Sequence, residues 1–135
     1  MINSIPLNEY VTDTMGLVLR IERRRFSSKA TKVFEAAEAG GTIVYIPSLV
    51  FAEILYLSER RKITLSLGQV ADYLKRFPNC KEYPMSMAVI QATAQVIDIT
   101  DLHDRIIAGT ARLLDKALIT NDPVIQASSW VKTVW

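Results

Sequence analysis

Four acidic residues stand in separate segments of the chain, each where a carboxylate can do chemistry. Asp13 and Asp122 each follow residues that favour extended structure, so we expect them at the carboxyl ends of strands. Asp104 begins a segment with helical apolar spacing, and Glu53 is the only charge in the apolar run at 49–57. Ligands of parallel sheets bind beyond the carboxyl ends of the strands. The sequence therefore predicts that these carboxylates meet at one edge of a sheet.

The predicted chemistry of such a cluster is that of a hard divalent cation. Nearby carboxylates repel and raise one another's pKa, and a bound cation removes that conflict. The chain has one cysteine and one histidine, so oxygen ligands favour Mg²⁺ or Mn²⁺ over zinc. We assign Asp13, Asp104 and Asp122 to the metal, and Glu53 to positioning or deprotonating a water. Such a site is suited to hydrolysis of phosphodiester bonds.

Each acid also has a structural explanation, and both explanations stay open at this point. Asp13 could cap the helix that follows it, and Asp122 before Pro123 matches an N-cap with proline at the first helical position. Asp101, three residues before Asp104, is interpreted as a cap or an outer contributor to the site. Glu53 lies inside a helical pattern, where the alternative is an ion pair with a buried base.

Other polar residues are secondary candidates. Thr14 and Thr120 could hydrogen-bond to the carboxylates or to a water at the metal. Arg105 could contact phosphate or pair with a neighbouring acid. His103, the single histidine, is interpreted as a surface or packed imidazole.

Strand and helix patterns alternate along the chain, which predicts an α/β fold with a mainly parallel central sheet of four to five strands. The run 42–46 has no polar alternation, as is typical of an interior parallel strand. The expected strands are 9–12, 42–46, 80–83, a brief one before Asp122, and 131–134. The first expected helix begins at Met15, has apolar spacing through Ile21 and closes in the arginines at 20–25. The second is capped by Ser27 or Ser28 and stopped by Gly40-Gly41, and the third is opened by Pro47-Ser48, carries 49–57 and ends in 59–62. The others are 66–77, 87–97, one beginning at 101–104 and one beginning at 122. Within 66–77 the residues expected to face inward are Leu67, Val70, Ala71 and Leu74.

Length and composition fit a single domain over residues 1–135 with a real core, since half of the residues are hydrophobic. One cysteine excludes an internal disulfide and suggests a reducing compartment. The sequence shows no leader-like start and no apolar stretch near the ~20 residues that span a bilayer, so we expect a cytoplasmic protein with no membrane partner. The net charge of +2 does not identify a nucleic-acid binder by itself. Basic groups at 20–25, 29–32, 60–62 and 75–76 offer a possible track for an RNA backbone.

Four motifs together carry a resemblance that covers almost the whole chain. They are VTDT at 11–14, IPSLVFAEI at 46–54, LHDRIIAGTA at 102–111 and LITND at 118–122. In their order and spacing the chain resembles PIN-domain ribonucleases, and more narrowly the toxins of VapBC-type toxin–antitoxin pairs. The resemblance implies a small α/β/α sandwich, usually homodimeric, that cleaves RNA with Mg²⁺ or Mn²⁺ and is covered by an antitoxin. By motif position the family's acidic residues fall on Asp13, Glu53, Asp104 and Asp122.

Three alternatives remain. The chain could be a non-catalytic RNA- or protein-binding module of the same fold, with its acids serving only as caps. It could be a housekeeping PIN nuclease that processes RNA. A phosphoaccepting receiver-like domain is less well supported, because the first strand ends in one acid where such a domain has an acidic pair.

Overall fold

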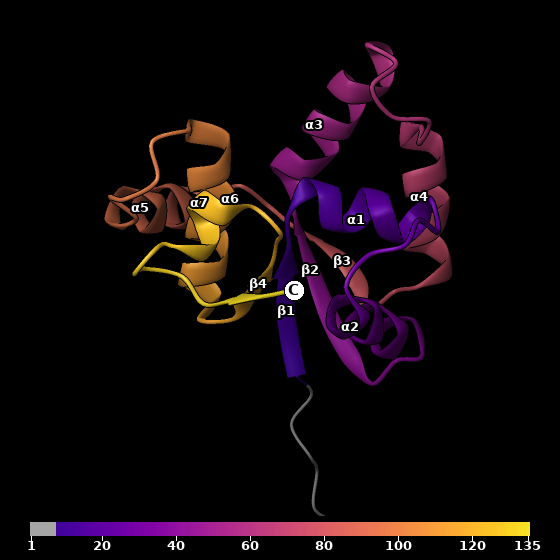
Figure 1. Ribbon diagram of the computed structural model, residues 1–135, viewed down its shortest axis with the longest axis horizontal. Helices are drawn as coiled ribbons and strands as arrows, with labels where there is room; N and C mark the ends of the chain where they lie inside the picture. Colours follow the sequence, from indigo (N-terminus) through magenta and orange to yellow (C-terminus); the bar gives the residue numbers. More distant parts are fainter. Residues whose placement is uncertain (1–7) are drawn as a thin grey trace, which may run out of the picture.

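Five parallel strands form the central sheet of the computed structural model, which describes residues 8–135. Their order across the sheet is β3-β2-β1-β4-β5, so β1 lies in the middle between β2 and β4 (Figure 1). Every pair is parallel, and the register places Thr12 opposite Ile119. The strands are β1 (Asn8–Thr12), β2 (Thr42–Pro47), β3 (Cys80–Tyr83), β4 (Ala117–Ile119) and β5 (Thr133–Val134).

Helices cover both faces of the sheet, which makes an α/β/α sandwich. Figure 1 shows the first four helices on one side and the last three on the other. The helices are α1 (Thr14–Ile21), α2 (Ser28–Glu38), α3 (Ser48–Glu59), α4 (Leu67–Arg76), α5 (Met87–Gln95), α6 (Leu102–Leu114) and α7 (Pro123–Gln126). The predicted fold class is therefore confirmed. Residues 1–7 of the predicted domain lie outside the described residues.

The local signals act as the sequence predicts at most boundaries. Ser27 caps α2 by accepting a hydrogen bond from the Ala30 N–H at 3.2 Å. Gly40, with φ of 88°, takes the left-handed conformation that ends this helix. The interior strand β2 continues into α3 at Pro47 without a loop.

Three details of the prediction were wrong. In α4, Leu67 and Ala71 are exposed, and the buried side chains are Val70 and Tyr73, because this helix turns the Tyr73 face towards the core. Helix α5 ends at Gln95, two residues earlier than predicted, because Val96 leaves helical geometry with ψ of 82°. The last strand contains only Thr133–Val134, because only these residues pair with β4.

The core consists of aliphatic residues from the strands and from one stripe of each major helix, with Phe34 as the largest fully buried side chain. Helices α5 and α6 lie especially close. A Cβ at Gly109 would collide with the backbone of Thr93, so the contact between these two helices requires glycine. This packing sets the position of α6, whose first turn carries Asp104. Within residues 8–135, no helix has both the length and the apolar character needed to cross a membrane.

Candidate metal centre

Asp13 stands at the carboxyl end of β1 and caps α1. Its N–H donates to the Ile119 carbonyl at 3.1 Å, and its Oδ1 accepts from the Gly16 N–H at 2.8 Å. A Cβ on residue 16 would come 2.5 Å from the Thr12 hydroxyl, so the turn that holds Asp13 requires glycine or a shift of that hydroxyl. Asp13 is therefore held between two strands and a helix start.

Asp122 reaches the same edge of the sheet from the neighbouring strand. It follows β4, and its Oδ1 accepts from the Val124 N–H at 2.8 Å to cap α7. The Asp122 N–H donates to the Thr120 hydroxyl at 3.1 Å. Thr120 is fully buried and also hydrogen-bonds to Asp13. Thr120 thus links the two aspartates. A hydrogen bond from this threonine to a carboxylate is one of the two contacts that the sequence suggested for it.

The first turn of α6 contributes Asp101 and Asp104. Asp101 is the N-cap, because its Oδ1 accepts from the Asp104 N–H at 3.0 Å. Asp101 is exposed, whereas Asp104 is partly buried. The charges of the other acids raise the pKa of Asp104. The cap interpretation of Asp101 is confirmed.

Glu53 lies between the two helix starts. One carboxylate oxygen accepts from the Thr14 hydroxyl at 2.6 Å, and the other lies 3.4 Å from His103 Nδ1. Thr14 belongs to α1 and His103 to α6, so Glu53 in α3 bridges segments far apart in sequence. Sequence reasoning gave His103 little weight. Its place beside Asp104 in the LHDR motif was the one signal that could have drawn attention to it.

The electrostatics of this edge are those of an uncompensated acid cluster. Burial, followed by the charges of Asp101, Asp122, Glu53 and Asp13, raises the pKa of Asp104 to about 6. Burial also raises the pKa of Asp13, against the hydrogen bonds from Thr120 and Gly16. In residues 8–135, no lysine or arginine pairs with Asp13, Asp104 or Asp122. The protein holds like charges together without a cation of its own.

The donor set of these residues fits Mg²⁺ or Mn²⁺ in chemistry, because it consists of carboxylate oxygens. Each cap on Asp13 and Asp122 is made through one carboxylate oxygen, so capping leaves each carboxylate a second oxygen. In the part of the chain that the structure describes, however, no three acidic, histidine or cysteine side chains are already close enough to hold a metal ion. Binding by Asp13, Asp104 and Asp122 would require their side chains to converge.

Arg105 contacts the end of α5, whereas a contact of Arg105 with phosphate stays a prediction. Its Nε donates to the Val96 carbonyl at 2.7 Å and to the Thr93 carbonyl at 3.1 Å, and its Nη2 donates to the Ala94 carbonyl at 3.1 Å. These carbonyls belong to the end of α5, where they lack helical partners. Arg105 thus joins α6 to α5, and it forms no ion pair with an acid in residues 8–135.

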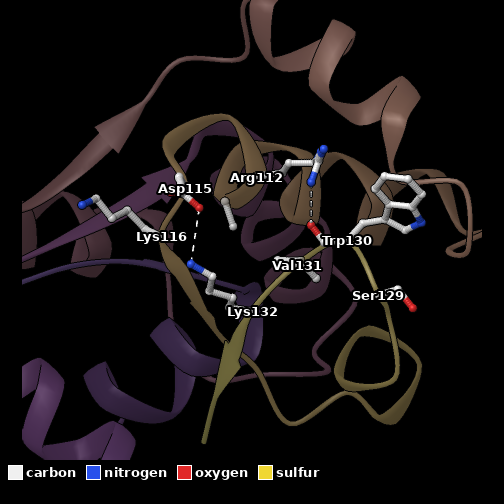
Figure 2. A pocket seen from close by; sticks show the side chains of 8 residues that line it. Arg112, Asp115, Lys116, Ser129, Trp130, Val131 and Lys132 are labelled. Atoms are coloured by element: carbon white, nitrogen blue, oxygen red, sulfur yellow. Dashed lines mark hydrogen bonds and ion pairs between the residues drawn. The ribbon is translucent and has the colours of Figure 1, made fainter.

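Two hollows of the surface bear on where the site lies. One adjoins the acids and is mainly apolar, lined by Leu49, Ala52, Glu53, Tyr56, Leu57 and His103. The other lies where α6 ends and β4 begins, and Figure 2 shows Lys132 beside Asp115 and Arg112 against Trp130 there. Asp115 is the single acid of this second hollow, 3.5 Å from the Lys132 amine. Only the first hollow belongs to the candidate centre.

Several solved structures share the fold of this chain. The crystal structure of VapBC2 from Rickettsia felis bound to a promoter DNA fragment superposes with a TM-score of 0.72 at 19% identity, over 94% of this chain and 98% of that one. VapBC from Salmonella typhimurium bound to DNA gives 0.69 at 15% identity, over 95% and 98%. FitAcB from Neisseria gonorrhoeae gives 0.65 at 16% identity, over 93% and 96%. At these identities the likeness shows a shared fold.

The comparison with curated protein sequences gives no match. The family model described as PIN domain matches residues 10–128, a span that runs from β1 through α7 and includes all four acids of the candidate centre. The chain therefore belongs to the PIN domain family.

Proposed function

We propose that this protein is an endoribonuclease that requires Mg²⁺ or Mn²⁺ and acts as the toxin of a toxin–antitoxin pair. The observation that carries the proposal is the cluster of Asp13, Glu53, Asp104 and Asp122 at one sheet edge, where burial and mutual repulsion raise the pKa of Asp104 and Asp13. Helix capping does not require these acids to lie together, and their mutual repulsion costs stability. Family membership adds weight to the nuclease assignment.

In this proposal each residue has a separate task. Asp13, Asp104 and Asp122 hold the ion, and a cation there supplies positive charge that stabilises the phosphoryl oxygens and favours deprotonation of water. Glu53, held by Thr14 at 2.6 Å, orients the attacking water and accepts its proton. Thr120 keeps Asp13 and Asp122 at a constant separation.

An antitoxin is the proposed protein partner. The similar structures include toxin–antitoxin assemblies, and the apolar hollow beside Glu53 and His103 would receive an apolar helix next to the acids. A homodimer is proposed as the state of the toxin itself, with Met85, Met87 and Ile90 among the exposed apolar side chains. The cytoplasm is the proposed location, because RNA is the proposed substrate.

Replacement of one acid by its amide tests the nuclease activity. Asn caps helices about as well as Asp, so Asp13→Asn keeps the Gly16 contact and removes the charge. RNA cleavage by this variant should vanish, while thermal unfolding stays cooperative. Asp101→Asn is the matched control, because Asp101 also caps a helix but is exposed. Full activity of Asp13→Asn would contradict the proposed site.

The second candidate function is a binding module that cleaves nothing. The absence of a ready-made group of three metal ligands within residues 8–135 favours it. A metal titration separates the two candidates. The enzyme should gain about 2.7 kcal/mol of unfolding free energy at Mn²⁺ a hundredfold above its Kd, through linkage. The binding module should gain none.

A further inference from the structure

Two exposed arginines after α1, Arg23 and Arg25, form no ion pair within residues 8–135, although the charge of Arg23 acts at longer range on Glu38. They belong to a surface hollow between α1 and α2, lined by Arg20, Arg23, Arg24, Arg25, Phe26 and Thr31. Arg20 pairs with Glu38 at 2.6 Å, and Arg24 pairs with Glu22 at 3.1 Å. Within residues 8–135, Arg23 and Arg25 form no ion pair, and both are exposed. The hollow therefore presents net positive charge to solvent.

The backbone at Arg23 is held in a conformation that suits glycine. Its φ is 58°, in the left-handed region, which costs a residue with a side chain about 1 kcal/mol or more. This position just after a helix is where glycine is common. Arg23 adopts this conformation despite its energetic cost, and its side chain lines the hollow. Arg61, with φ of 56°, has the same conformation after α3 but does not line this hollow.

The hollow lies at one end of α1 and the acid cluster at the other. Asp13 caps the first turn of α1 and Arg23 follows its last turn, so this helix of eight residues, about 12 Å long, lies between them. The carboxylates repel a polyanion, and Arg105 is engaged with α5 carbonyls. In the metal-free protein, attraction for an anionic strand near the acid site then comes from cations further along the surface.

We propose that Arg23 and Arg25 form a phosphate-binding subsite that holds the backbone of a single RNA strand whose other part lies at the acid cluster. Guanidinium groups bind phosphate oxygens in pairs of hydrogen bonds and keep their charge at any physiological pH. The subsite adds affinity that is largely independent of base sequence. It rests on the proposed function for the identity of the polyanion as RNA.

Arg23→Gly tests the subsite, because it removes the charge and also relieves the backbone strain. Binding of a fluorescent single-stranded RNA is measured by anisotropy in EDTA, which prevents metal-dependent cleavage. The slope of log affinity against log salt should decrease by about 0.7 for Arg23→Gly, and by about 1.4 for Arg23→Gly with Arg25→Ala. Affinity should fall several-fold at low salt, with the melting temperature unchanged or higher.

Arg61→Gly controls for the backbone alone, since it makes the same substitution in the same left-handed conformation outside the hollow. Its melting temperature should change as that of Arg23→Gly does. Lys116→Ala is the control for charge, because Lys116 lies outside the hollow and outside the four basic groups, and its salt slope should stay that of the wild type. Equal slopes for Arg23→Gly and the wild type would overturn the subsite. Loss of binding to an acidic protein partner with unchanged RNA affinity would overturn it as well.

Competition with inorganic phosphate at constant ionic strength identifies the source of the phosphate. RNA bound to the wild type should resist it, because a strand makes several contacts at once. If free phosphate binds the hollow tightly and leaves RNA affinity unchanged, the RNA assignment is wrong. Failure of the nuclease proposal is distinguishable, because an active Asp13→Asn variant leaves the EDTA binding data untouched.

Discussion

The acidic side chains at the two ends of α1 have opposite electrostatic surroundings. At its start, Asp13 and Glu53 lie near Asp104 and Asp122 with no lysine or arginine paired to them in residues 8–135. At its end, Glu38 accepts two hydrogen bonds from Arg20 at 2.6 and 2.8 Å and a third from the Tyr73 hydroxyl. The start of α1 thus lies in an acid cluster that has no paired lysine or arginine in residues 8–135. The end of α1 contacts Glu38, a largely buried acid that accepts hydrogen bonds from Arg20 and Tyr73.

The pKa values follow this difference. Although burial raises it, the pKa of Glu38 is lowered overall by hydrogen bonds from Arg20 and Tyr73. The pKa of Glu22 is likewise lowered, against burial, by Thr64, Arg24 and Leu65. The pKa values of Asp104 and Asp13 are raised, because burial is joined by like charges. Glu38 and Glu22 are thus held in the ionised form by hydrogen bonds and opposite charge, whereas ionised Asp104 and Asp13 are destabilised by burial and like charges.

Asp104→Asn should give the largest effect and separates the two ends most clearly. Loss of one of the proposed metal ligands should reduce the RNA cleavage rate about a thousandfold, or about 4 kcal/mol of transition-state stabilisation. The metal-free variant should be more stable than the wild type, because a repelled charge is gone. Cleavage assays and denaturant unfolding in EDTA measure the two effects, and a variant that is inactive but less stable would mean that Asp104 is structural.

Glu38→Ala should produce the opposite result. It leaves Arg20, whose side chain is 10% exposed, without its partner, and should cost about 3 kcal/mol of unfolding free energy. Chemical denaturation measures this cost. Per folded molecule, RNA cleavage should remain close to that of the wild type. A loss of cleavage in fully folded Glu38→Ala would show that the two ends of α1 are coupled.

In the metal-free protein, the unfolding free energy should first rise and then fall as pH is lowered. Asp104 has a folded pKa of about 6, above its usual 3.8, so its ionised form destabilises the fold above pH 6. As pH falls from 7 to 5, the unfolding free energy should rise by about 0.7 kcal/mol, because linkage with a pKa of about 6 gives about 1.3 kcal/mol over this range and the partial exposure of Asp104 reduces it. Below the usual pKa of glutamate the lowered values of Glu38 and Glu22 reverse the trend, and stability falls. Denaturation in EDTA across this range, with Asp104→Asn as the control, measures it; a rise that persists in this variant would point to another group.

Asp101 should show the smallest effect and sharpens the distinction between a cap and a ligand. Asp101→Ala removes the contact to the Asp104 N–H and should cost about 1 kcal/mol, whereas Asp101→Asn should cost almost nothing. Both variants should retain metal-dependent cleavage. If Asp101→Asn loses cleavage as severely as Asp104→Asn, the division between these neighbours is wrong.

Much of the fold and the candidate acids could be predicted because their signals are local. The run TIVYI, the caps at Ser27, Asp101 and Asp122, and the glycines after α2 each act within a few residues. Partners across elements could not be predicted in this way. Arg20 and Arg105 belong to sequence patterns that suggested surface charge or a phosphate contact, and packing turned one towards Glu38 and the other towards the end of α5.

The sequence by itself determined the order of strands and helices along the chain, the parallel α/β class, three acids at element ends and Glu53 within a helix, since these depend on periodicity and capping. The tertiary structure alone decided that Glu53 lies between Thr14 and His103. It also decided that Arg20 and Arg24 form ion pairs, whereas Arg23 and Arg25 form none within residues 8–135. Such distinctions depend on which side chains meet when helices pack on a sheet, and no stretch of neighbouring residues encodes that alone.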